Sequence, residues 1–418
     1  MELKRVVVTG IGAITPIGNN VSEYWDNLLK GVSGCSHITH FDASKFKTQI
    51  ACEVKNFDEK DYFERKEARK YDRYAKLGLV AATEAVEDSG LHKAGAIDGD
   101  RVGVIWASGI GGLETFQSEL EGFVKGDFRP RFNPFFIPKM IADITSGHIS
   151  IKYGFRGPNF ATVSACASSA NALSDAFNYI RLGKAKAFVV GGSEAAVTPV
   201  GVGGFNAMHA ISTRNDDPAT ASRPFDADRD GFVIGEGGAG LVFEELEHAL
   251  ARGAKIYAEV AGAGLSGDAY HMTAPHPEGY GAYLCMKAAV EDAGMSIKDI
   301  DHINTHGTST PVGDVVEPQA IVKLFGDHAY EININSTKSM TGHLLGGAGA
   351  VEAIAALLSV KNDIIPPTIN HFKLDEKIDS KLNFTFDKAQ KRTVNAALSN
   401  TFGFGGHNAS IIFKKFVQ

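Results

Sequence analysis

Two hydrophobic periodicities alternate along the chain. Short apolar runs such as VVVTG at 6–10 and VGVIWA at 102–107 predict buried strands, and the stretches between them carry the three-to-four-residue apolar spacing of amphipathic helices. This alternation is typical of an α/β protein. Because 418 residues are more than one simple core can bury, we expect two domains or one duplicated domain.

The order of predicted elements repeats once. Each copy begins with a helix pattern, AVEDSGL at 85–91 or AVEDAGM at 289–295, and continues through a glycine stop and a short loop into a strand pattern, RVGVIWASG or HINTHGTS. A second pair follows in the same order. It predicts a strand, a turn of small residues and a helix, both in NFATVSACASSANAL at 159–173 and in ININSTKSMTGHLLGGAGAVE at 332–352. Two repeats in one order predict two halves that share a fold.

The boundary between these halves is predicted near 250–260, where a new strand pattern opens much as RVVVTGIGA opens the first half. We therefore expect an N-terminal half over 1–257 and a C-terminal half over 258–418. A pseudo-twofold axis between them would bring the loops that follow corresponding strands together into one site.

Composition narrows the class of protein. The apolar share of 44% and the charged share of 22% are those of an ordinary globular protein. A net charge of -7 argues against a nucleic-acid binder that acts through bulk charge. The sequence shows neither an uncharged apolar span of about 20 residues, as a membrane helix needs, nor the pattern of a signal peptide. We expect a cytoplasmic protein without a membrane partner.

Four cysteines are spread along the chain without CxxC pairs or metal-ligand spacing, so we expect neither a disulfide framework nor a metal: Cys35, Cys52, Cys166 and Cys285. Cys166 differs from the others because a strand pattern gives way there to the small residues of a predicted helix start. The N–H groups and positive dipole of a helix N-terminus favour a thiolate, so we expect a lowered pKa. A buried structural cysteine is the commoner alternative.

Three segments match ligand motifs by letters but lack the context that those motifs need. A strand pattern follows GEGGAG at 235–240, where a dinucleotide fingerprint needs a helix. The calcium-like start DADRDG at 226–231 has Gly237 where the twelfth-position glutamate belongs. The pair of histidines in HINTH at 302–306 lacks the glutamate of the zinc motif and lies at a strand end. We expect no dinucleotide, calcium or zinc site at these segments.

Three segments of the second half place reactive side chains among glycine and threonine: NTHGTST at 304–310, NSTKSMTGHLLGGAGAVE at 335–352 and NTFGFGGHN at 400–408. Most of the 14 histidines are expected to be structural. His306 and His343 differ because each lies in a loop after an apolar strand pattern, where α/β folds carry functional groups. Lys338, taken alone, would be a solvated lysine. The cysteine segment and these three loops together favour a catalytic site.

The combined motifs resemble the β-ketoacyl-acyl carrier protein synthases, most closely the type II members of bacterial fatty acid synthesis. The resemblance covers essentially the whole chain, from VVVTGIGAITPIG through SACASS, NTHGTST and KSMTGHLLGGAGAVE to FGFGGHN. It implies the thiolase-like fold, a five-layered αβαβα arrangement of two duplicated halves, in agreement with the repeat described above. It also implies a homodimer that works with acyl carrier protein and needs no cofactor beyond the phosphopantetheine that carries its substrates.

The activity implied by the resemblance is a decarboxylative Claisen condensation with a ping-pong mechanism. An acyl chain passes from acyl carrier protein to Cys166 as a thioester, and the enolate formed from malonyl-acyl carrier protein then attacks it. Backbone N–H groups of Cys166 and Phe404 would form the oxyanion hole. His306 and His343 would donate N–H bonds to the enolate oxygen as neutral imidazoles.

The remaining implied roles concern electrostatics and substrate binding. Lys338 would polarise the histidines, with Glu352 as its partner. Four further residues are expected to line the acyl tunnel or hold the pantetheine arm: Ile110, Phe205, Thr308 and Thr310. A docking patch for the acidic carrier protein is implied for three basic residues at helical spacing in FERKEARKYDRYAK at 63–76, although a solvated helix face is the ordinary explanation: Lys66, Arg69 and Lys70.

Alternatives with the same nucleophile stay open. A ketosynthase subunit of a type II polyketide synthase, or a type I-like ketoacyl synthase, would use the same cysteine and histidines. A chain-length-controlling partner subunit would lack Cys166. A degradative thiolase would need a second catalytic cysteine, whereas Cys285 lies in the helix pattern GAYLCMKAAVEDAG and is expected in the core.

Overall fold

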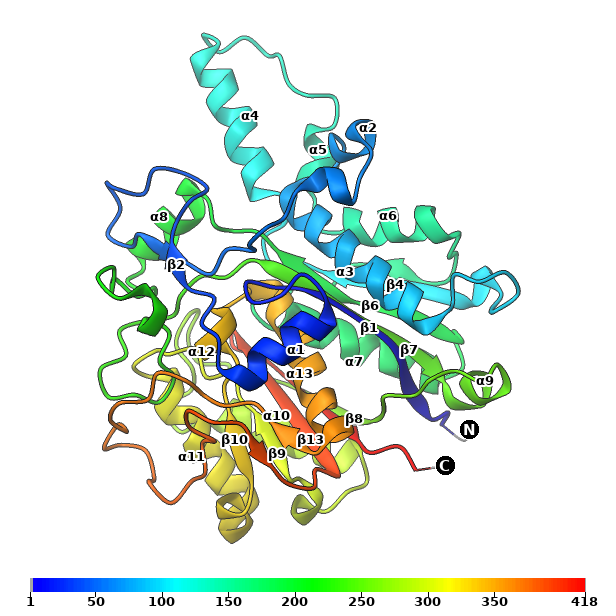
Figure 1. Ribbon diagram of the computed structural model, residues 1–418, viewed down its shortest axis with the longest axis vertical. Coiled ribbons are helices and arrows are strands. Elements are labelled where there is room, and N and C mark those ends of the chain that lie inside the picture. The colour runs from blue at the N-terminus through cyan, green and yellow to red at the C-terminus, as the bar shows by residue number, and fades with distance from the viewer. Residues whose placement is uncertain (1–2, 418) are drawn as a thin grey trace.

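Ten strands form one continuous sheet whose two halves have the same internal order (Figure 1). The structure is a computed structural model that describes residues 3–417. The first half contributes β1 (Val6–Ile14), β4 (Val102–Ala107), β5 (Asn159–Phe160), β6 (Ala187–Glu194) and β7 (Gly237–Glu245). The second half contributes β8 (Ala258–Gly267), β9 (His302–Asn304), β10 (Asn333–Asn335), β13 (Ala396–Gly403) and β14 (His407–Lys414).

The strand order from the middle of the sheet outward is β1-β7-β6-β4-β5 on one side and β8-β14-β13-β9-β10 on the other. In each half the first two pairings are antiparallel and the next two are parallel. The halves meet where Val6–Val8 of β1 pairs antiparallel with Ala258–Val260 of β8. The predicted duplication is therefore confirmed at the level of topology, while the boundary at 257 stays a prediction.

Helices at equivalent places complete five layers. Inside, α7 (Ser168–Arg181) and α13 (Ala348–Asn362) pack against each other and against strands of both halves. Outside, α3 (Arg73–Ser89) and α6 (Ile144–Tyr153) cover the first half, while α10 (Tyr280–Asp292) and α11 (Gly313–Phe325) cover the second. Four of these helices, α3, α7, α10 and α13, are the ones that the repeated sequence patterns predict.

Close packing of the outer helices repeats in both halves. A Cβ added to Gly10 of β1 would lie 2.2 Å from the carbonyl oxygen of Ala85 on α3, and one added to Gly264 of β8 would lie 2.2 Å from that of Cys285 on α10. Each position therefore needs a glycine. Cys285 is fully buried at this contact, which confirms its predicted place in the core.

The remaining helices and strands lie in the connections, and α4 projects from the body of the molecule (Figure 1). They are α1 (Val21–Lys30), β2 (Ser36–His37), β3 (Ile50–Ala51), α2 (Arg65–Ala68), α4 (Leu113–Lys125), α5 (Phe136–Met140), α8 (Pro199–Ala207), α9 (Leu246–Ala251), α12 (Lys338–Thr341), β11 (Ile364–Ile365) and β12 (Gln390–Lys391). Within residues 3–417, no helix combines the length and the apolar character that crossing a membrane requires.

One buried carboxylate ties the two ends of the described chain together. Glu259 on β8 accepts hydrogen bonds from the guanidinium of Arg5 at 3.0 and 2.7 Å. The ammonium of Lys414, on β14, lies 3.6 Å from the same carboxylate. The first and last strands of the chain therefore lie on either side of β8.

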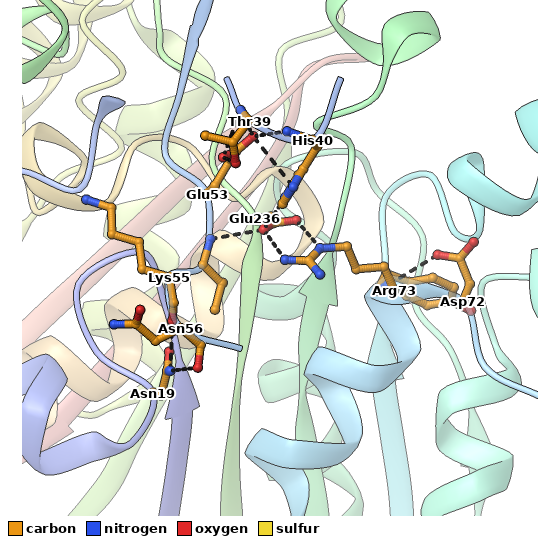
Figure 2. Close-up of polar contacts among 11 residues, drawn as sticks. Asn19, Thr39, His40, Glu53, Lys55, Asn56, Asp72, Arg73 and Glu236 are labelled. Carbon is orange, nitrogen blue, oxygen red and sulfur yellow. Dashed lines mark hydrogen bonds and ion pairs between the residues drawn. The ribbon is translucent and has the colours of Figure 1, made fainter. Parts of the chain in front are cut away.

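A buried polar cluster anchors the segment around β2 and β3 (Figure 2). The fully buried carboxylate of Glu236 accepts two hydrogen bonds from Arg73, at 2.7 and 2.6 Å, and further ones from His40 at 2.9 Å and the backbone N–H of Val54 at 3.0 Å. Burial opposes ionisation of Glu236, but the hydrogen bonds of Arg73 and His40 outweigh it and lower its pKa to about 2. We call Glu236, Arg73 and His40 the Glu236 cluster.

Candidate active site

A cavity of about 520 Å³ opens where the loops of the two halves meet, and it is lined mainly by apolar surface. Its lining includes Cys166 from the first half and three predicted residues of the second, His306, His343 and Phe404. Ile110, Phe205, Thr308 and Thr310 line the same cavity. Residues far apart in the sequence thus converge on one site, as the predicted duplication requires.

Cys166 lies in a strained turn just before α7. Ala165 has a left-handed backbone with φ of 51°, and the N–H of Ala167 donates back to the carbonyl of Ser164 at 3.1 Å. A non-glycine residue in this region carries strain that the surrounding structure must maintain. The turn leaves the Cys166 side chain at the cavity although the residue is only 8% exposed.

The thiol of Cys166 is less acidic than its helix position predicts. Burial raises its pKa to about 11, against the opposing effects of the Lys338 charge and the backbone N–H of Phe404. The expected lowering is therefore wrong for the free protein, because loss of water around the sulfur outweighs the charge of Lys338 and the backbone N–H groups. The backbone N–H groups of Phe404 and Cys166 still act on the sulfur as donors and favour its thiolate.

Two neutral imidazoles face each other beside the cysteine. The rings of His306 and His343 have centroids 5.2 Å apart and are nearly perpendicular, at 86°. Burial and the charge of Lys338 hold the pKa of both histidines well below its usual range, and His343 lowers that of His306 further. The Nδ1 atom of each ring has no hydrogen-bond partner among the described residues. Both rings therefore have hydrogen-bonding capacity to spare.

A buried ion pair lies behind the histidines. Lys338, the first residue of α12, pairs with Glu352 on α13, as predicted, and both side chains are almost fully buried. Burial raises the pKa of Glu352 to about 7, although Lys338 acts in the opposite direction. The second carboxylate oxygen of Glu352 makes no hydrogen bond within residues 3–417. The pair therefore places one positive charge near both imidazoles.

The His306 loop is held by a carboxylate that sequence analysis did not single out. Glu317 on α11 accepts the backbone N–H groups of His306 at 2.9 Å and Gly307 at 3.0 Å, and the side-chain amide of Asn400 at 3.1 Å. Burial raises the pKa of Glu317 to about 7. The signal in the sequence is an acidic residue inside the apolar run VVEPQAIV at 315–322, which a search for reactive motifs passes over.

The loop that carries Thr308 and Thr310 is braced by the segment that resembles a calcium motif. Arg229 donates to the carbonyl oxygens of Thr310 and Pro311 at 2.8 Å each and forms an ion pair with Asp375 at 2.8 Å. The hydroxyls of Thr308 and Thr310 lie 3.1 Å apart. Arg229 of DADRDG therefore holds a loop of the cavity in place.

The apolar wall of the cavity connects to the histidines through aromatic contacts. Phe205 makes an edge contact with Phe232 at 5.4 Å between ring centroids, and Phe232 makes another with His343 at 5.2 Å. Ile110 is 41% exposed and lies at the same cavity. A change in the shape of this wall can therefore reach the ring of His343.

The predicted docking residues lie outside the lining of the cavity, on a segment that is not one continuous helix. Of the three, only Lys66 lies in α2, which ends at Ala68. Arg69 and Lys70 lie between that end and Asp72, which caps the start of α3. Lys70 pairs with Glu67 at 2.5 Å. Their role in docking stays a prediction.

Comparison with known proteins gives matches over the whole chain. Residues 3–249 match the Beta-ketoacyl synthase, N-terminal domain, and residues 257–372 match the Beta-ketoacyl synthase, C-terminal domain. The 3-oxoacyl-[acyl-carrier-protein] synthase 2 of Synechocystis sp. is 48% identical over 416 residues, covering 100% of this chain and 99% of the relative. The protein of the same description from Staphylococcus aureus is 49% identical over 413 residues, covering 99% of each.

Solved structures with the same fold include a beta-ketoacyl synthase from Burkholderia phymatum, with a TM-score of 0.92, 34% identity and coverage of 99% of this chain and 100% of the other. A type II polyketide ketosynthase in complex with its acyl-carrier protein matches with a TM-score of 0.92 and 33% identity, over 99% of this chain and 100% of the other. The thiolase-like fold class predicted from the sequence is confirmed by these matches and by the five layers.

Proposed function

This chain belongs to the β-ketoacyl synthase family and condenses acyl-acyl carrier protein with malonyl-acyl carrier protein in fatty acid elongation; we propose that Cys166 carries the acyl chain during that reaction. The observation that carries the proposal is the convergence of one thiol, two backbone donors and two neutral imidazoles on one apolar cavity.

Acyl transfer uses the Cys166 side of the cavity. The thiol attacks the thioester carbonyl, and the backbone N–H groups of Cys166 and Phe404 stabilise the negative oxygen of the tetrahedral intermediate. Because the pKa of Cys166 is about 11, the thiol proton must pass to a base as the sulfur attacks. A neutral imidazole at the same cavity is such a base. Collapse of the intermediate breaks the bond to the carrier-protein sulfur, which takes the proton from the imidazole and leaves as a thiol, so that the histidine is neutral again.

Decarboxylation uses the histidine side. Loss of carbon dioxide from the malonyl group leaves an enolate, whose oxygen needs hydrogen-bond donors that do not protonate it. His306 and His343 meet this need because both are held neutral. The enolate carbon then attacks the acyl-Cys166 carbonyl, and the bond between that carbon and the Cys166 sulfur breaks. The Cys166 thiolate takes a proton from water to restore the thiol. Lys338 and Glu352 support the histidines electrostatically.

Substrate binding follows from the lining of the cavity. Thr308 and Thr310 present hydroxyls suited to the amides of a pantetheine arm, while Ile110 and Phe205 give the acyl chain an apolar wall. No cofactor is needed, since the phosphopantetheine arrives with the carrier protein. Lys66, Arg69 and Lys70 would meet the acidic surface of that protein.

We further propose a cytoplasmic homodimer. Helices α4 and α5 and the loop between them carry exposed large apolar side chains, which a second copy would cover: Phe116, Leu120, Val124, Phe128, Phe132 and Ile137. A polyketide ketosynthase subunit remains the second candidate because of the structural match at 33% identity. The 48–49% identity to fatty acid synthases favours the first.

Product analysis tests the assignment. The chain is incubated with malonyl-acyl carrier protein and acyl-carrier primers of graded length, and products and the Cys166 peptide are analysed by mass spectrometry. We expect 3-oxoacyl products two carbons longer than the primer and an acyl group on Cys166. Cys166→Ala should abolish condensation while malonyl decarboxylation survives. An unchanged condensation rate in that variant, or turnover with acyl-CoA primers only, would contradict the proposal.

A further inference from the structure

One further buried carboxylate lies close to the turn that carries Cys166 and has no part in the reaction described above. Glu194 is the last residue of β6 and is fully buried. Its carboxylate accepts the hydroxyl of Ser108 at 2.7 Å and the backbone N–H groups of Gly109 at 2.7 Å and Ile110 at 3.2 Å. It also accepts the backbone N–H of Gly346 at 3.0 Å. One side chain therefore joins a loop of the first half to a loop of the second.

The partners of Glu194 in the described chain are all neutral donors. Burial raises its pKa, and these four hydrogen bonds act in the opposite direction. A buried carboxylate that gathers backbone N–H groups in this way organises loops, because each donor would otherwise be left unsatisfied away from water. Glu194 therefore acts through the loops that it holds.

Those loops enclose the cavity next to Cys166. Ile110 and Leu345 both line the cavity. Ile110 donates its backbone N–H to Glu194, and Leu345 precedes Gly346, which donates its own. The packing leaves no slack: a Cβ added to Gly109 would lie 2.9 Å from the Glu194 carboxylate and 3.3 Å from the carbonyl of Ala165, and one added to Gly346 would lie 2.1 Å from the N–H nitrogen of Gly109. Three segments thus meet at this carboxylate: the turn that carries Cys166, the loop that carries Ile110 and the loop that follows His343.

We propose that Glu194 is a positioning residue that sets the acyl-chain preference, by holding Ile110 and Leu345 in a fixed relation to Cys166. This inference rests on the proposed function, because it assumes that the cavity receives the acyl chain. Glutamine at this position offers one acceptor oxygen where two now serve four donors. The two loops then lose part of their common anchor, and the pocket wall becomes less defined.

The test compares kcat/KM for primers of graded length in four variants. In Glu194→Gln, we expect the ratio between the best and the worst primer to fall at least about fivefold, since one methylene in a well-formed pocket is worth about tenfold or more. The matched control is Glu244→Gln. Glu244 is a fully buried carboxylate on β7, the strand that pairs with β6. It lies opposite Ala187, at the other end of β6 from Glu194, so the rise of the strand separates the two carboxylates by roughly 23 Å. It should lower stability without changing the ratio.

Ile110→Phe serves as the positive control. It narrows the pocket directly and should shift preference towards shorter primers. If it does not, the acyl pocket of the proposed function is wrong. If Ile110→Phe shifts the preference but Glu194→Gln changes the primer ratio no more than Glu244→Gln does, the proposed function stands and the inference about Glu194 is overturned.

A fourth variant keeps the proposal testable when Glu194→Gln does not fold. Ser108→Ala retains the carboxylate but removes its hydroxyl donor, which also accepts the N–H of Gly111 at 2.9 Å. The ratio between the best and the worst primer should fall about twofold, in the same direction as for Glu194→Gln. A ratio equal to that of the unmodified protein would overturn the inference.

Discussion

Two polar clusters in this protein are each built around a buried carboxylate, a basic side chain and histidine, and they are held in opposite electrostatic states. In the Glu236 cluster, both carboxylate oxygens have partners, the pKa of Glu236 is lowered to about 2 and that of His40 is raised. In the site cluster of Lys338, Glu352, His306 and His343, the pKa of Glu352 is raised to about 7 and those of the histidines are lowered. The first cluster favours the charged forms of its carboxylate and imidazole, and the second favours the neutral forms of its carboxylate and imidazoles.

Hydrogen-bond saturation explains the difference. The carboxylate of Glu236 receives a bidentate guanidinium, an imidazole and a backbone N–H, whereas three atoms of the site cluster lack partners in the described chain. A saturated network holds segments together, while an unsaturated one is costly until a ligand completes it. A change in the Glu236 cluster should therefore lower stability more than activity, and a change in the site cluster should do the reverse. Four measurements test this difference.

The largest effect is expected from His343→Ala. Loss of one donor to the enolate should lower the condensation rate by about 10²–10³-fold. Because the Nδ1 of His343 has no partner in the described residues, the melting temperature should fall less than it does on changing Glu236. Steady-state kinetics with carrier-protein substrates and thermal unfolding give both values. Activity within a few-fold of the unmodified protein would remove His343 from the reaction.

Glu236→Gln should show the reverse pattern. It leaves the mostly buried guanidinium of Arg73 without its ionic partner, which costs about 3 kcal/mol in the free energy of unfolding. Condensation at 25 °C should fall far less than for His343→Ala, because Glu236 touches no reacting group and connects to His343 through the backbone, where the N–H of Gly235 donates to the His343 carbonyl at 2.9 Å. Denaturant unfolding and the same kinetic assay measure both quantities. A large fall in rate without loss of stability would show that the two clusters are coupled.

The pH dependence of Cys166 alkylation tests whether the site suppresses charge. A thiol with a pKa of about 11 is protonated at pH 7, so the rate of reaction with iodoacetamide should rise about tenfold per pH unit between pH 7 and 10. Mass spectrometry of the Cys166 peptide follows the reaction. A rate that levels off below pH 8 would mean that the free protein already holds a thiolate.

The smallest effect concerns His40. Burial opposes its protonation, but the hydrogen bond and charge of Glu236 outweigh burial and raise its pKa in the folded state. The stabilisation from protonated His40 is therefore complete below the unfolded pKa of about 6.5 and is lost as the pH rises through the folded pKa. His40→Gln should reduce stability by about 1 kcal/mol at pH 5.5 and by less at pH 9. A penalty that grows with pH would reverse the assigned sign.

Local patterns in the sequence predict most of the fold and the members of the site. The repeated helix and strand patterns place His306 and Cys166 in loops beside strands, and the lysine and glutamate of KSMTGHLLGGAGAVE form the expected pair. Their convergence follows from the duplication. These predictions succeed because they depend on periodicity and on short spacings along the chain.

Properties set by distant contacts escape the sequence. The pKa of Cys166 depends on how deeply the turn is buried, which outweighs its place before a helix. Glu194 acts on residues 84 to 152 positions away, so no local motif marks it. Even the spacing of Lys66, Arg69 and Lys70 misleads, because the cap at Asp72 divides the segment into two helices.

The carboxylate of Glu259, which binds both Arg5 and Lys414, brings the start of β1 and the end of β14 to the same end of β8, a geometry that would let the two halves follow each other in either order along the chain. A linker of a few residues could join the two ends, and new ends could open in the connection between α9 and β8. Such a circular permutant would begin with β8 and finish with α9. Every strand would keep its neighbours, and the half that carries the histidines would leave the ribosome before the half that carries the thiol.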